Sequence, residues 1–122
     1  MSLKINVNVT DDNYFSKLLL VLSVINPFSR LSNTELSVYA ELLLLNYQHR
    51  KIPFTERNML IFNKDNKELI TNKLNLSTTR VDACLSRLRK LGLIEGKELV
   101  PKYIINKVPQ IIFVFSEDNG EE

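Results

Sequence analysis

Residues 74–96, LNLSTTRVDACLSRLRKLGLIEG, decide the fold, because a tight turn, an amphipathic helix and the start of a hairpin follow one another there. Asn75 suits the left-handed conformation of a tight turn, and Ser77 is a favourable N-cap. A helix is predicted over residues 78–91, where apolar residues recur at helical spacing. They are Val81, Leu85, Leu88 and Leu91, with Cys84 at the edge of the stripe. Gly92 is placed to end this helix.

A hairpin is predicted directly after this helix. Its first strand begins at Leu93 and Ile94, and Gly96 marks its turn. Residues 99–105 are predicted to return as the second strand, although Pro101 limits the pairing of that strand.

The segment before the tight turn is less regular. Asp65 or Asn66 is predicted to cap a helix over residues 67–74. Residues 48–65 leave two alternatives open, a short helix capped by Thr55 or a strand.

Two further helices are predicted nearer the N-terminus. The helix over 32–47 has Ser32 as its N-cap and Glu35 three residues later, which is the pattern of a capping box. Another helix is predicted over 12–25, and Pro27 stops it. Both helices are apolar on more than one face, which indicates either a buried helical pair or a seam between two copies in a homodimer.

The two ends of the chain are predicted to meet. Residues 3–9 alternate between apolar and polar types, which is typical of a half-buried strand, and residues 110–115 form an apolar strand that could pair with them. Residues 116–122 are expected to be a disordered acidic tail. These elements predict one domain over residues 1–115.

Composition narrows the function classes. The chain has 122 residues, suited to one domain, and 44% of them are hydrophobic. Its longest apolar run, residues 18–25, is shorter than the roughly 18 residues that cross a membrane. Cys84 is the single cysteine and His49 the single histidine, which excludes an internal disulfide and leaves almost no material for a zinc site. We therefore expect a cytoplasmic protein of a bacterial or phage-infected cell, with no cofactor, no metal and no enzymatic activity.

Charge is distributed unevenly along the chain. Residues 1–49 have a net charge of −1, residues 50–107 have +7 and residues 108–122 have −4. A basic middle segment is typical of a nucleic-acid-binding protein, although solvated charged faces are also common.

The order of helix, tight turn, helix, Gly-Leu-Ile and hairpin resembles the winged helix-turn-helix family. The chain is most similar to MarR-type transcriptional regulators and to the N-terminal winged-helix domains of phage replication initiators. The resemblance covers a core motif at residues 31–106. It implies an α+β, mainly α fold: a winged helix-turn-helix with an added N-terminal strand and helix and a small antiparallel sheet.

In such a fold the second helix of the motif would enter the major groove of DNA with its first turns against the bases. Arg80 could contact a guanine through two hydrogen bonds, and Arg87 could reach a phosphate. Basic residues on the preceding helix and on the wing would contact the backbone. The predicted DNA-binding residues are Lys67, Lys73, Ser77, Thr78, Thr79, Arg80, Ala83, Arg87, Lys90 and Lys97.

Two observations keep other interpretations open. Asp82 points outward on the same side of the helix, where phosphates would repel it unless it pairs with Arg89 or Ser86 or accepts from a cytosine amino group. The hydroxyl residues could serve only as caps, and cations near a helix C-terminus are favourable without DNA.

The first hypothesis is a non-enzymatic protein that binds double-stranded DNA as a homodimer. It would act in transcription regulation or replication initiation, and a phage or other mobile element could encode it. The alternative is a winged-helix module that binds a protein partner within a larger assembly.

Overall fold

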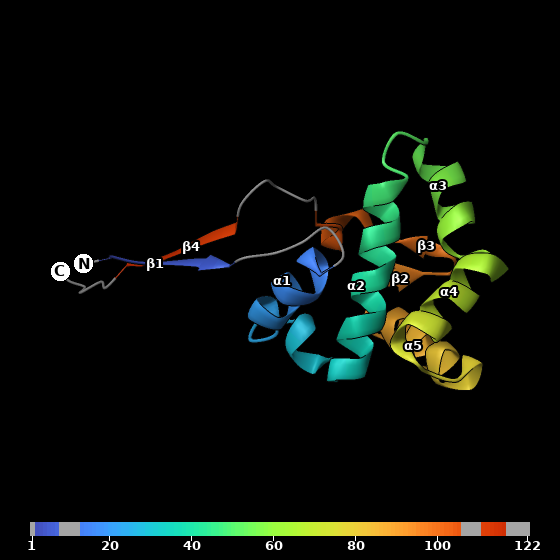
Figure 1. Ribbon diagram of the computed structural model, residues 1–122, viewed down its shortest axis with the longest axis horizontal. Coiled ribbons are helices and arrows are strands. Elements are labelled where there is room, and N and C mark those ends of the chain that lie inside the picture. Colours follow the sequence, from blue (N-terminus) through green and yellow to red (C-terminus); the bar gives the residue numbers. More distant parts are fainter. Residues whose placement is uncertain (1, 8–12, 106–110, 117–122) are drawn as a thin grey trace.

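The computed structural model describes the backbone of residues 2–7, 13–105 and 111–116, and the side chains of residues 13–105. This part of the chain is mainly helical with two small antiparallel sheets, which confirms the predicted α+β, mainly α class (Figure 1). The strands are β1 (Ser2–Val7), β2 (Ile94–Glu95), β3 (Glu98–Leu99) and β4 (Ile111–Ser116). The helices are α1 (Tyr14–Leu22), α2 (Asn33–Gln48), α3 (Phe54–Ile61), α4 (Lys64–Leu74) and α5 (Thr78–Lys90), with short 3-10 turns at Phe28–Arg30 and Pro101–Tyr103.

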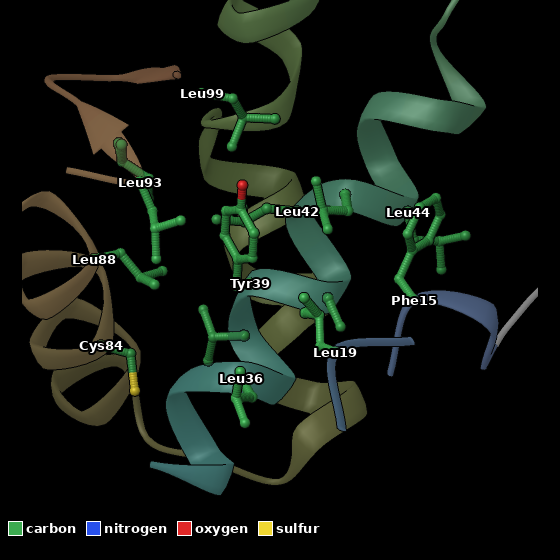
Figure 2. Close-up of a cluster of buried hydrophobic side chains, with 14 of the residues drawn as sticks. Phe15, Leu19, Leu36, Tyr39, Leu42, Leu44, Cys84, Leu88, Leu93 and Leu99 are labelled. Carbon is green, nitrogen blue, oxygen red and sulfur yellow. The ribbon is translucent and has the colours of Figure 1, made fainter. Parts of the chain in front are cut away.

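Helix α2 forms the centre of the molecule. Its predicted capping box is confirmed: the Glu35 amide donates to Ser32 Oγ at 3.1 Å, and the Ser32 amide donates to Glu35 Oε1 at 2.9 Å. Every residue from Val38 to Asn46 is buried, because α1, α3, α4 and α5 pack against different sides of the helix. Figure 2 shows α2 between side chains of α1 and side chains of α5. Helix α2 is therefore an interior helix, so its apolar faces are covered within the chain.

Helix α1 is shorter than predicted. It ends at Leu22 instead of residue 25, and the Ser23 hydroxyl donates to the Leu20 carbonyl at 2.6 Å. Its buried residues Tyr14, Phe15, Leu18 and Leu19 contact the core, whereas several residues near its C-terminal end are exposed.

The sequence left a short helix and a strand as alternatives for residues 48–65. This segment contains a helix, so the strand alternative is wrong. Helix α3 starts after Pro53, and not at a Thr55 cap. The Arg57 guanidinium holds the preceding loop, because it donates to the Ile52 carbonyl at 2.9 and 3.1 Å and to Asn46 Oδ1 at 3.0 Å.

Helix α4 begins at Lys64, earlier than predicted. Its N-cap is Asn63, whose side chain accepts from the Asn66 amide at 2.8 Å, and the predicted caps Asp65 and Asn66 lie inside the helix. The observed N-cap lies earlier than the predicted ones because α4 follows α3 directly: Phe62 is the C-cap of α3 and Asn63 is the N-cap of α4.

The tight turn and both ends of α5 form as predicted. Asn75 is left-handed with φ 54°, and Ser77 Oγ accepts from the Arg80 amide at 3.1 Å. After α5, Gly92 has φ 84° and donates to the Arg89 carbonyl, while the Leu93 amide donates to the Leu88 carbonyl at 3.0 Å. This pair of bonds is a Schellman motif.

The hairpin after α5 is shorter than predicted, and the prediction of a second strand over residues 99–105 is wrong. Strand β3 stops at Leu99 because Pro101 has no N–H to continue a ladder. The chain turns instead, and the Tyr103 amide donates to the Val100 carbonyl at 3.0 Å. The Tyr39 hydroxyl of α2 donates to the Tyr103 carbonyl at 2.8 Å and fixes this turn against the core.

The two ends of the chain pair as predicted. Strands β1 and β4 run antiparallel, with Ser2 opposite Ser116 and Val7 opposite Ile111. This ribbon extends away from the helices on the side where α1 lies (Figure 1). The remaining residues of the two predicted strands, and the predicted tail beyond residue 116, lie outside the described residues.

Candidate nucleic-acid interface

The outward side of α5 presents small residues along its middle. Val81, Cys84, Leu85 and Leu88 are buried and face α2, as Figure 2 shows for Cys84 and Leu88. At 3.6 residues per turn, the opposite side of the helix carries Thr79, Ala83, Ser86 and Lys90, and all four residues are exposed. This outer stripe has no bulky side chain before Lys90, so the helix backbone can approach another surface closely.

The start of α5 exposes hydroxyl groups next to free backbone amides. The Ser77 hydroxyl already caps the helix by accepting from the Arg80 amide, whereas Thr78 and Thr79 are exposed. Hydroxyls and N–H groups at a helix N-terminus suit anionic oxygens.

One flank of the outer stripe carries two arginines of α5, and the backbone of a third arginine lies beside them. Arg80 and Arg87 follow one another at a spacing of two turns, and Arg87 Nη2 donates to the Arg30 carbonyl at 3.3 Å. Arg30 lies in the turn before α2 and is exposed. The contact places the backbone of Arg30 beside this flank, next to the predicted residues of α5. Sequence reasoning missed it because no local pattern connects residues 57 positions apart.

The other flank carries Asp82, whose carboxylate pairs with the Lys67 ammonium of α4. The predicted partners Arg89 and Ser86 are on the same helix, whereas the observed partner comes from the preceding helix, α4. The pair places a cation directly beside the carboxylate, so this flank carries no uncompensated negative charge from Asp82.

A hollow of about 200 Å³ lies on this flank between α4, α5 and the hairpin. It is lined by Phe62, Lys67, Asp82, Leu85, Ser86, Arg89 and Lys97. Arg89 Nε donates to the Gly96 carbonyl at 2.7 Å and so connects α5 to the hairpin turn. Within residues 13–105 no carboxylate forms an ion pair with Arg89 or Lys97. The hollow therefore has cationic groups available for an anion, and Arg89 is an addition to the predicted site.

Lys73, a predicted contact residue, is engaged inside the molecule. Its ammonium lies 3.0 Å from Glu41 Oε1, and the Glu41 side chain is only 6% exposed. A carboxylate this buried requires a cationic partner. The first role of Lys73 is therefore to compensate the charge of Glu41.

Cys84 lies in the core between α5 and α2. It is buried, and this burial raises the pKa of its thiol, with a smaller contribution from Glu35 that Arg80 opposes. A buried thiol with a raised pKa is a poor nucleophile, so Cys84 acts as a small apolar residue.

Comparison of the chain with protein-family models, with curated proteins and with solved structures found no match. Among the residues that the structure describes, none of the helices combines the length and apolarity needed to cross a membrane. The same residues contain no cluster of three or more His, Cys, Asp or Glu side chains arranged to hold a metal ion.

Proposed function

We propose that this chain is a non-enzymatic winged-helix protein that binds double-stranded DNA through α5. Helices α4 and α5 would be its helix-turn-helix, and the β2–β3 hairpin would be its wing. One observation carries the proposal: the outer stripe of α5 is small and polar, and basic side chains flank it on both sides. Transcription regulation or replication initiation, in a phage or other mobile element, is the process that best suits such a protein.

This arrangement fits the major groove, which is about 12 Å wide and admits one helix. The small residues Thr79, Ala83 and Ser86 would allow α5 to approach the base edges. Arg80 would contact a guanine, and Arg87 with Arg30 would contact phosphates of one strand.

The hollow on the other flank would receive a phosphate of the opposite strand. Arg89 and Lys97 border it and keep donor groups for an anion, because Arg89 uses only Nε to hold the hairpin turn. Lys90 extends the basic surface at the end of α5.

Asp82 would be repelled by DNA phosphates if its carboxylate were unpaired, but it forms an ion pair with Lys67. A carboxylate with an adjacent ammonium repels phosphate far less than an isolated one. We assign Lys67 to the compensation of Asp82 and Lys73 to the compensation of Glu41, so α5 and the hairpin carry the DNA contacts in this proposal.

Fluorescence anisotropy with a random duplex of about 30 base pairs, titrated at two salt concentrations, tests the proposal. We expect wild-type binding that weakens steeply as salt increases, because phosphate contacts release counterions. Arg87→Ala should reduce the slope of log affinity against log salt by about one, because Arg87 is assigned to a phosphate. The matched control is Lys51→Ala, an exposed cation between α2 and α3 and far from α5, which should leave the slope unchanged. Absence of wild-type binding at low salt would contradict the proposal.

Asp82→Asn should strengthen binding to the random duplex several-fold, because the substitution removes a negative charge beside the phosphates and leaves Lys67 free to contact them. Lys67→Ala should have the opposite effect, since it uncovers the Asp82 charge. Equal affinities for wild type and both variants would show that this flank of α5 does not meet DNA.

A second candidate is a module that binds a protein partner. The observation in its favour is an open hollow of about 550 Å³ between α3 and the hairpin, lined on one side by Met59 and Phe62 and on the other by Glu95 and Glu98. Exposed Met59 beside carboxylates suits a basic, apolar peptide better than DNA. Two results together would favour the second candidate. The wild-type chain would fail to bind duplex at any salt concentration, and charge reversal of Glu98 would abolish a complex with a protein partner.

A further inference from the structure

A groove of about 550 Å³ separates α3 from the β2–β3 hairpin. Its α3 wall carries Met59, which is 71% exposed, and the half-buried Phe62. Methionine is flexible and polarisable, and it is common on surfaces that bind peptides. A hollow of this size is large enough to receive a few side chains of a partner.

The hairpin wall of the groove is acidic. Glu95 and Glu98 stand directly opposite each other in the β2–β3 ladder, and both are exposed. The neighbouring pair, Ile94 and Leu99, is buried, so the two glutamates lie on the side of the hairpin away from the core. Like charges directly opposite each other destabilise a sheet. Within residues 13–105 neither carboxylate forms an ion pair, so a cation from outside the chain would relieve their repulsion.

One cation of the chain also borders the groove. Lys97 lies in the hairpin turn, and it lines both this groove and the smaller hollow beside α5. The lining residues thus place two carboxylates against one ammonium, while the adjacent charged residues Glu56 and Lys64 offset each other. The groove therefore has a net negative charge in a chain whose net charge is +2. Charge complementarity favours a cationic occupant.

Asn58 fixes the shape of the groove and limits how a partner can bind. Its Oδ1 accepts from the Leu99 amide at 2.9 Å, and its Nδ2 donates to the Phe54 carbonyl at 2.9 Å. The two walls are therefore joined before any partner binds, which lowers the entropic cost of binding. Because the Leu99 amide is already engaged, an added strand cannot use it. A partner must bind through its side chains instead of extending the sheet.

We propose that this groove docks a segment of a partner protein in which lysine or arginine flanks an apolar side chain. The apolar side chain would pack on Met59 and Phe62, and the cation would lie between Glu95 and Glu98. No residue of α5 lines the groove, so the segment can dock there whether or not α5 binds DNA. Docking of this kind deepens the second candidate function and adds to DNA binding instead of replacing it.

Titration of the full chain with a blocked peptide, Lys-Lys-Leu-Lys-Lys, followed by NMR amide shifts, tests the proposal. We expect saturable shifts in α3 and the hairpin. Glu95→Gln combined with Glu98→Gln should weaken binding by at least about fivefold, because two ion pairs are lost. Lys97→Met should strengthen binding about twofold, because it removes the cation that lines the groove. The matched control is Glu68→Gln, an exposed carboxylate of α4 outside the groove, which should leave the affinity unchanged.

The apolar contact has its own variant. Met59→Ser should weaken binding of the leucine peptide about threefold, whereas Leu69→Ser, at an exposed apolar residue of α4, should not change it. Thermal unfolding verifies that each variant remains folded.

Three results would overturn the proposal: no saturable binding of the leucine peptide, wild-type affinity in the double glutamine variant or in Met59→Ser, and equally tight binding of the acidic peptide Glu-Glu-Leu-Glu-Glu. These titrations contain no DNA, so they stand whatever the duplex experiment shows.

Discussion

Asn58→Ala is expected to lower the free energy of unfolding by about 2–3 kcal/mol, because it leaves a buried backbone N–H without an acceptor. Asn58 is 1% exposed, and its Oδ1 accepts from the Leu99 amide at 2.9 Å. Its Nδ2 donates to the Phe54 carbonyl at 2.9 Å. One side chain thus connects α3 to β3, and its removal should loosen the hairpin as well as destabilise the fold.

Urea unfolding measures the loss, and hydrogen exchange at the Leu99 amide localises it. Asn72→Ala provides the control, since Asn72 is also an asparagine in a helix but is exposed. We expect a change of no more than about 0.5 kcal/mol for the control. Equal stabilities for the two variants would show that the Asn58 contact does not hold the hairpin.

Lys73→Ala should destabilise the fold by about 2 kcal/mol, because the buried Glu41 carboxylate would lose its counter-ion. The loss of a fully buried partner costs more, but water reaches the exposed part of Lys73 and reduces the penalty. Thermal or urea unfolding at neutral pH measures the effect. If Lys73 served chiefly to contact DNA, stability would stay at the wild-type value and affinity for duplex would fall instead.

Two further variants make this result specific. Lys64→Ala removes a different lysine of α4. Lys64 lies in the first turn of the helix and is exposed, so its removal should change stability little. Glu41→Gln in the Lys73→Ala background should recover much of the lost stability, because a neutral amide requires no counter-ion. A double variant as unstable as Lys73→Ala would rule out the charge as the cause.

Features that depend on a few neighbouring residues could be predicted from the sequence. The capping box at Ser32, the left-handed turn at Asn75 and the end of α5 at Gly92 each involve bonds between residues no more than five positions apart. Their conformations are decided locally, so the sequence contains the whole signal.

Features that depend on tertiary packing could not be predicted in this way. Residues 99–105 are apolar enough for a strand, but Pro101 and the bond from Tyr39 to Tyr103 turn the segment against α2. The partner of Asp82 and the contact between Arg87 and Arg30 both depend on how α5 lies against its neighbours. Residue spacing along α5 could suggest only partners from the same helix for Asp82, such as Arg89 and Ser86.

The exposed outer stripe of α5 also bears on how such a protein can change over time. Thr79, Ala83 and Ser86 lie opposite the residues that hold α5 to the core, so replacing them alters no packing. Exposed substitutions of this kind usually change stability by no more than about 0.5 kcal/mol. Substitutions along this stripe can therefore change the surface that α5 presents at almost no cost in folding stability, whereas residues 38–46 of α2, which are all buried, have little freedom to vary.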